Sequence, residues 1–126
     1  MVRQPVSTRA GLLAGLAGAS AVMLGALGAH ALRTVLDADR LGIWRTAVDY
    51  HAWHALALVL AIALGQGRSR RAAIAGFALG IVLFSGSLYA LALGAPRWVG
   101  IVTPFGGVAF ILGWLALGLS LRTPAS

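Results

Sequence analysis

The sequence contains no cysteine, no lysine and no glutamate. The absence of cysteine excludes disulfides, thiolate metal sites and cysteine nucleophiles. Paired carboxylates, a nucleophile elbow of the G-x-S-x-G type and a phosphate-binding glycine loop are also missing. We therefore expect neither catalytic residues nor a cofactor.

Charge of any kind is scarce. Charged residues make up 10% of the chain and hydrophobic residues 60%, with a mean hydropathy of +0.89, whereas a soluble domain has about 25% charged residues. No charged residue interrupts four long runs, residues 10–32, 50–67, 72–96 and 98–121. A helix needs roughly 20 apolar residues to cross the hydrocarbon core of a bilayer. Each run is close to that length or longer.

The runs predict an all-α integral membrane protein in which one domain, residues 1–126, forms a bundle of four transmembrane helices. The second run is short, so its helix must begin earlier, near Ala47. Pro104 falls early in the fourth run, where it either occupies the first helical turn or kinks the helix. The predicted spans are residues 10–32, 47–66, 72–94 and 99–121.

The only long polar connection, Arg33–Asp49, joins the first two spans. Leu41, Trp44 and Val48 recur within it at helical spacing, while arginines take other faces. This pattern predicts an amphipathic helix that lies in the membrane interface and runs into the second span.

The net charge of +7 comes from arginine. The arginines flank the apolar runs, as in membrane proteins that contact lipid headgroups, and form no basic stripe of the kind that binds nucleic acid. With four spans, six arginines lie on the side of both termini and four on the other side. The positive-inside rule then predicts a bacterial inner-membrane protein with both termini in the cytoplasm.

Small residues recur at alternating spacings of four and three in the first and third spans. Because small residues let transmembrane helices approach closely, we expect these glycines to form helix-packing seams. The predicted packing glycines are Gly11, Gly15, Gly18, Gly25, Gly76, Gly80 and Gly94.

Polar side chains gather in the half of each span that lies away from the termini. Such residues form either interhelical hydrogen bonds or a site for a proton or ligand. The candidates for this polar cluster are His30, Asp49, Tyr50, His54, Ser85, Ser87, Tyr89 and Thr103. His51 and His54, three residues apart, and His30 lack the Cys, Glu or suitably spaced Asp that would complete a metal site, so we expect no bound metal.

Four segments resemble one family. Gly25–Leu32, Trp44–Leu58, Leu83–Tyr89 and Thr103–Gly107 are similar, in the same order, to motifs of the YgdD-like small inner-membrane proteins, which carry a domain of unknown function (number 423). The resemblance implies a four-helix membrane protein without an established activity. It also implies that His51 stands where relatives often have Gln, which weakens a metal site that depends on this residue.

The leading hypothesis is a scaffold or accessory subunit that acts through helix–helix contacts. Its partners would be the lipid bilayer together with other inner-membrane proteins or further copies of the chain. One alternative is a small transporter or proton-linked carrier that uses the polar cluster. Another is a module that binds a quinone, a lipid or a metal.

Overall fold

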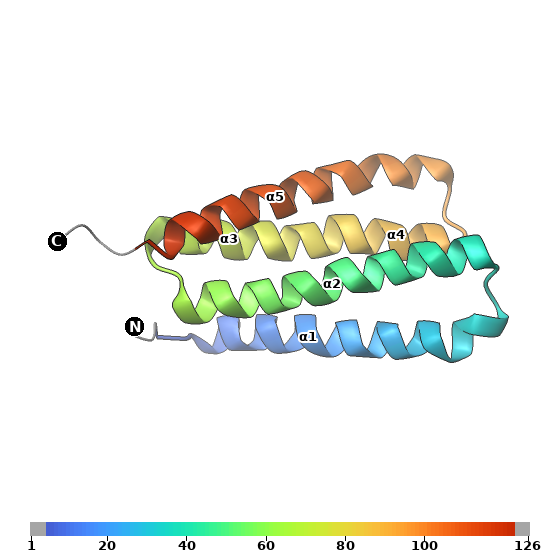
Figure 1. The fold of residues 1–126 in the computed structure, drawn as a ribbon, viewed down its shortest axis with the longest axis horizontal. Helices are drawn as coiled ribbons and strands as arrows, with labels where there is room; N and C mark the ends of the chain where they lie inside the picture. Colours follow the sequence, from blue (N-terminus) through green and yellow to red (C-terminus); the bar gives the residue numbers. More distant parts are fainter. Residues whose placement is uncertain (1–4, 123–126) are drawn as a thin grey trace.

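Four long helical spans run antiparallel in the computed structural model, which describes residues 5–122 (Figure 1). Arg3 lies outside the described residues. The chain enters and leaves the bundle at the same end. The elements in chain order are α1 (Thr8–Ala29), the 3₁₀ segment η1 (Ala31–Thr34), α2 (Ala38–Leu64), α3 (Gly67–Gly80), the π-helical segment η2 (Ile81–Ser85), α4 (Gly86–Ala92), the 3₁₀ segment η3 (Arg97–Ile101) and α5 (Val102–Ser120).

The prediction of four membrane-spanning helices is confirmed. Four helical stretches, 8–34, 38–64, 67–92 and 97–120, are long and apolar enough to cross a bilayer. The third consists of α3, η2 and α4, which follow one another without a break. Pro104 lies in the first turn of α5, after η3, so it takes the first of the two predicted positions.

The amphipathic helix expected before the second span is present and runs into that span, as predicted. Asp37 starts α2, and the helix continues to Leu64 without interruption, so the predicted amphipathic segment forms the first turns of the second span. The physical reason is that no proline or turn sequence breaks the chain near Ala47. The 3₁₀ segment η1 and a short turn make the connection from α1.

Polar groups define where the helices begin and end. The Ser7 side chain accepts a hydrogen bond from the Ala10 amide at 3.1 Å, and Asp37 accepts one from the Arg40 amide at 2.9 Å. Both are N-cap interactions, which satisfy amides that have no partner within the helix. At the other end of α2, the Arg70 guanidinium donates to the carbonyl of Ile62 at 2.7 Å.

The closest helix pair is the third span with α5, and glycine makes this closeness possible. A Cβ atom added to Gly76 would lie 2.8 Å from the Cα atom of Gly113, and one added to Gly106 would lie 2.7 Å from the Cα atom of Phe84. At these points one backbone packs directly on another. Phe77 and Phe110 fill the adjoining core and are almost completely buried.

The first helix is attached much less firmly. Among the described elements, α1 packs along its length against α2 only, whereas α2 also contacts the third span and α5 (Figure 1). Ala21 is the only fully buried residue of α1. The bundle is therefore a compact group of three spans with α1 along one side.

Candidate functional site

His51 is the centre of the longest polar chain in the bundle. It is buried, and its Nε2 atom lies 3.1 Å from Ser20 Oγ on α1 while its Nδ1 atom lies 2.9 Å from the Tyr89 hydroxyl on α4. The Ser20 hydroxyl is also 3.1 Å from the carbonyl of Ala17. One imidazole thus connects three of the four spans.

One arrangement of protons satisfies all three contacts. The Tyr89 hydroxyl donates to Nδ1 of His51, Nε2–H donates to Ser20 Oγ, and the Ser20 hydroxyl donates to the Ala17 carbonyl. With the opposite tautomer, the Ser20 hydroxyl would have to choose between two acceptors. The hydrogen bonds therefore run in one direction, from the Tyr89 hydroxyl through His51 and Ser20 to the backbone carbonyl of Ala17.

His54 makes a second and separate contact, on another side of α2. Its Nδ1–H donates to the carbonyl of Tyr50, and its Nε2 atom accepts a hydrogen bond from the Trp114 indole on α5 at 3.0 Å. The imidazole stacks on Phe110 with ring centroids 3.5 Å apart. Both ring nitrogens are occupied, so this histidine joins α2 to α5 through the protein's own groups.

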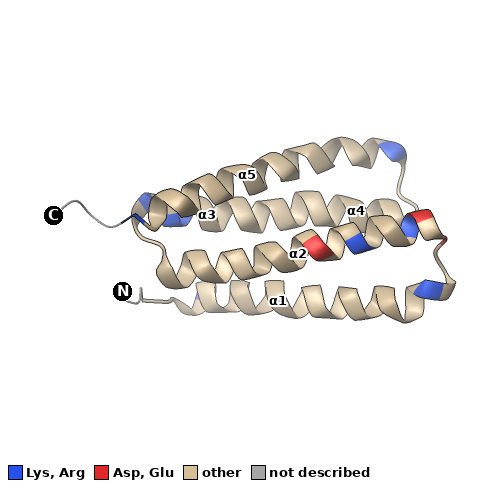
Figure 2. Cartoon of the chain, in the orientation of Figure 1, with Lys and Arg blue, Asp and Glu red and all other residues tan. Residues whose placement is uncertain are grey.

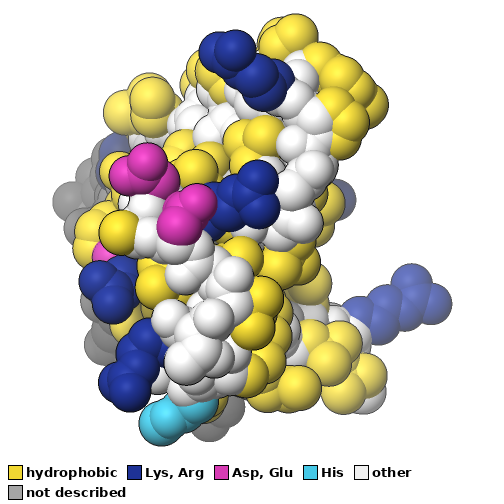
Figure 3. All heavy atoms as spheres, turned by 90° about the vertical axis from the view of Figure 1, so that its right-hand side faces the viewer, with side chains coloured by type: hydrophobic (Ala, Val, Ile, Leu, Met, Phe, Trp, Pro, Cys, Tyr) yellow, Lys and Arg dark blue, Asp and Glu magenta, His cyan; other side chains and the backbone are white. Residues whose placement is uncertain are grey.

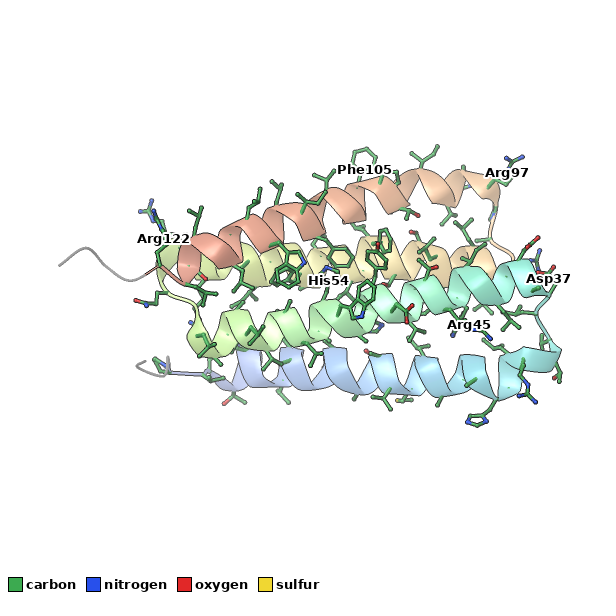
Figure 4. All side chains as sticks on the ribbon, in the orientation of Figure 1. Asp37, Arg45, His54, Arg97, Phe105 and Arg122 are labelled. Carbon is green, nitrogen blue, oxygen red and sulfur yellow. The ribbon has the colours of Figure 1, made fainter. Side chains whose placement is uncertain are left out.

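An aromatic cavity of about 690 Å³ opens beside His54, between α2 and α5. Figure 4 shows the His54 side chain among aromatic rings in the middle of the bundle. Most of its wall is apolar; its lining residues include Tyr50, Trp53, His54, Phe84, Phe110 and Trp114.

Two serine hydroxyl groups of the third span each form one further contact with another span. Ser85, at the end of the π-helical segment, donates to the carbonyl of Ala47 on α2 at 2.7 Å. Ser87 donates to the Phe84 carbonyl at 2.9 Å and lies 2.6 Å from the Thr103 hydroxyl on α5. Within residues 5–122, every buried side-chain nitrogen or oxygen has a hydrogen-bond partner.

The predicted polar residues are thus divided among separate contacts. The structure brings Ser87 to Thr103, and it places Tyr89 on His51, a residue that the predicted cluster omitted. His30 ends α1 with an exposed side chain and is not among the partners of His54. Asp49 is also exposed, in a pocket between α1 and α2.

Three glycines of the first span, Gly11, Gly15 and Gly18, lie beside its contact with α2, whereas Gly25 and Gly28 lie within it. Nothing lies within 4 Å of a Cβ added to Gly15 or Gly18, and one added to Gly11 would only touch Val6 at 4.0 Å. A Cβ atom added to Gly25 would lie 3.3 Å from the Val48 side chain, and Gly28 lies directly against the Trp44 ring. The residues of α1 that face α2 or the core are Ala10, Ala14, Ala17, Ala21, Gly25 and Gly28.

In the third span, the glycines serve two purposes. Gly76 and Gly80 lie against α5, the second of them against the Phe110 ring. Gly94 lies in the turn after α4 with a φ angle of +104°, a backbone conformation that glycine adopts without strain.

A groove with a floor of small residues opens between α1 and α2. It has a volume of about 380 Å³ and an almost entirely apolar wall. Gly18, with open space around it, lies at one side, and Val22 is 73% exposed at the rim. We call this site the α1–α2 groove; its lining residues are Gly18, Ala21, Val22, Ala52, Ala55 and Leu56.

Comparison with known proteins places the chain among uncharacterised membrane proteins. A UPF0382 membrane protein of Staphylococcus saprophyticus is 47% identical over 84% of this chain and 90% of its own length. The UPF0382 membrane protein YwdK of Bacillus subtilis is 44% identical over 77% of this chain and 82% of its own length. The UPF0382 inner membrane protein YgdD of Escherichia coli is 44% identical over 82% of this chain and 81% of its own length.

No solved structure matches the chain. The family model described as a protein of unknown function, DUF423, matches residues 24–107. This range contains His51, His54, Ser85, Tyr89 and Thr103, so most of the interhelical polar contacts lie within the matched segment. The chain is a small multi-pass membrane protein of unestablished activity that belongs to the DUF423 family.

Proposed function

We propose that the protein is a scaffold or accessory subunit that binds a transmembrane helix of another inner-membrane protein in the α1–α2 groove. The observation that carries this proposal is the groove itself. Gly18 and three alanines form much of its lining, and no other part of the described chain fills it.

The argument depends on what drives association inside a bilayer. Lipid tails are as apolar as leucine, so exposed leucine and valine side chains on a spanning helix give little tendency to associate. Small residues differ because they let a second backbone approach closely. The comparable surfaces at Gly76 and Gly106 are already used within the bundle, whereas those at Gly15 and Gly18 are open.

The hydrogen-bond geometry favours this function over transport. A carrier needs polar groups that can exchange partners with a substrate or with water. The buried polar side chains of residues 5–122 all have partners within the protein, and His51 and His54 use both ring nitrogens. This pairing supports a structural role for the polar residues, and the family comparison adds no support for transport, quinone binding or metal binding.

Co-purification with a groove variant tests the proposal. Gly18→Leu puts a large side chain at the wall of the groove, and its Cβ atom would meet nothing within 4 Å. Gly118→Leu on α5 is the matched control, since nothing lies within 4 Å of a Cβ added there either.

We expect tagged wild type and the Gly118→Leu variant to retain the same partner from native membranes, and the Gly18→Leu variant to lose at least about 90% of it. Equal recovery with all three proteins would contradict the proposal. A second, differently tagged copy of the chain as the recovered protein would assign the groove to a homo-oligomer instead.

We further propose that both termini face the cytoplasm. Arg9, Arg68, Arg70, Arg71 and Arg122 lie toward the end of the bundle where the chain begins and ends, and basic residues near both ends of the bundle are visible in Figure 2. The excess over the opposite end supports this orientation through the positive-inside rule. A fluorescent protein that folds only in the cytoplasm should be bright when fused after Ser126, and a dark fusion with an active periplasmic reporter would reverse the orientation.

A further inference from the structure

A polar pocket lies between α1 and α2 at the end of the bundle opposite the termini. Its volume is about 330 Å³, and its wall includes the side chains of Arg33, Trp44, Arg45 and Asp49. Figure 4 shows Arg45 extending from α2 toward α1. Figure 3, which views this end directly, shows arginine and aspartate side chains between apolar patches.

The pocket lies at the boundary between lipid tails and headgroups. The 27 residues of α2 span roughly 40 Å at 1.5 Å per residue, about 10 Å more than a hydrocarbon core. If the core begins near Leu64, just before Arg68, it ends about 20 residues earlier, near Trp44 and Arg45. Asp49 then lies about one turn inside the hydrocarbon, where a carboxylate needs a partner.

The geometry of the pocket is held by the Trp44 side chain of α2, which contacts the backbone of α1. The Trp44 indole donates to the carbonyl of Leu24 at 2.8 Å, and its ring packs against Gly28. This contact fixes the distance between α1 and α2 beside the pocket. Arg33 on η1 and Arg45 on α2 are both exposed, so their guanidinium groups are accessible from the membrane interface.

The pocket carries a net charge of +1, which an anion with one negative charge would neutralise. Arg33 and Arg45 carry two positive charges and Asp49 one negative charge. Asp49 is four residues after Arg45 on the same helix, a spacing at which the two side chains can pair. Guanidinium groups bind phosphate oxygens through parallel hydrogen bonds, and a single phosphodiester would neutralise the remaining charge.

We propose that this pocket binds the headgroup phosphate of an anionic phospholipid of the phosphatidylglycerol type. Arg33 and Arg45 hold the phosphate, Arg45 also neutralises Asp49, and the Trp44 ring forms the apolar wall beside the glycerol backbone of the lipid. The acyl chains leave the pocket into the surrounding lipid.

Native mass spectrometry of the purified full-length protein in detergent, titrated with phosphatidylglycerol or phosphatidylethanolamine, tests this proposal. We expect one tightly bound phosphatidylglycerol per chain, and weaker binding of the zwitterionic lipid by at least about fivefold. Arg33→Gln and Arg45→Gln should each weaken phosphatidylglycerol binding about fivefold, which corresponds to about 1 kcal/mol per arginine near a membrane surface. Arg97→Gln is the matched control, because Arg97 begins η3 near the same end and does not line the pocket.

A variant that binds the lipid more tightly shows that the weaker binding of the arginine variants does not come from a loss of structure. Asp49→Asn removes the negative charge that competes with the phosphate for Arg45, so it should tighten phosphatidylglycerol binding. Equal affinity for both lipids would overturn the proposal, as would an Arg97→Gln effect as large as that of Arg45→Gln. Displacement of the lipid by an equal concentration of inorganic phosphate would assign the pocket to a soluble anion instead.

Discussion

Gly106 and Gly107 are adjacent on α5 but meet very different surroundings. A Cβ atom added to Gly106 would lie 2.7 Å from both Cα and Cβ of Phe84 and would also collide with the Phe84 amide nitrogen. A Cβ added to Gly107 would meet only Cδ2 of the Phe84 ring, at 3.9 Å. The difference in unfolding free energy between an alanine variant at Gly106 and one at Gly107 therefore measures how tightly the third span and α5 pack.

The expected magnitude follows from two opposing terms. Replacing glycine by alanine inside a helix gains about 1 kcal/mol, and this gain is common to both positions. Overpacking costs about 1–3 kcal/mol where neighbours can adjust, and Phe84 adjusts poorly because the clash involves its backbone in the π-helical segment. Gly107→Ala should raise the free energy of unfolding by up to about 1 kcal/mol, and Gly106→Ala should lower it by about 1–2 kcal/mol.

Reversible unfolding in mixed micelles, followed by far-ultraviolet circular dichroism as the fraction of denaturing detergent is raised, measures this difference. The comparison of neighbours cancels the helix-propensity term and leaves the steric one. A difference below about 0.5 kcal/mol between the two variants would refute the close backbone approach of Gly106 to Phe84.

Three further changes test other parts of the fold. His51→Leu should lower the free energy of unfolding by about 1–2 kcal/mol, because each interhelical hydrogen bond in a membrane contributes about 0.6 kcal/mol and up to about 1.7; a double-mutant cycle with Ser20→Ala would isolate the part due to α1, and zero coupling would contradict the contact. Gly28→Val should displace the Trp44 ring and expose α1 to added protease, while unchanged digestion would contradict this packing. His30→Ala should leave the stability unchanged within about 0.5 kcal/mol in the same unfolding assay, because the side chain is exposed.

The presence of four spanning helices could be predicted because the length of an apolar run is a local property of the sequence. The hydrocarbon thickness of the bilayer requires a run of apolar residues, and charged residues end each run regardless of the rest of the fold. The helix that precedes the second apolar run was predicted from a different signal, the helical spacing of Leu41, Trp44 and Val48. Asp37 caps a helix that already exists before the apolar run begins, so the limits of hydropathy and of helical structure differ there.

The packing surfaces could not be predicted as well, because they depend on the neighbouring helix. In the first span, alanines and glycines alternate so closely that two adjacent faces carry small residues. The face with Ala14, Ala17 and Ala21 meets α2 or the core, whereas Gly15 and Gly18 lie next to that contact. If glycine alone is taken as the sign of a packing face, the sequence favours the face with Gly15 and Gly18 over the face that contacts α2.

The role of His51 was missed for a similar reason. A three-residue spacing suggested that it shared a face with His54, but the two side chains point to different neighbours, one toward α1 and α4 and the other toward α5. The signal that could have identified it was a serine in the middle of an otherwise apolar first span. Ser20 needs a hydrogen-bond partner across the helix interface, and His51 provides it.

Site-specific crosslinking in native membranes tests the proposed binding surface most directly. The chain has no cysteine, so a single cysteine introduced at the rim of the α1–α2 groove is unique. Val22→Cys provides this position. Val82→Cys, in η2 and outside the groove, is the control because Val82 is 67% exposed and Val22 is 73% exposed. We predict that a short photoreactive crosslinker attached to the introduced thiol captures a discrete membrane-protein adduct at position 22 and none at position 82. The same adducts at both positions, or none at position 22, would contradict a partner helix in the groove.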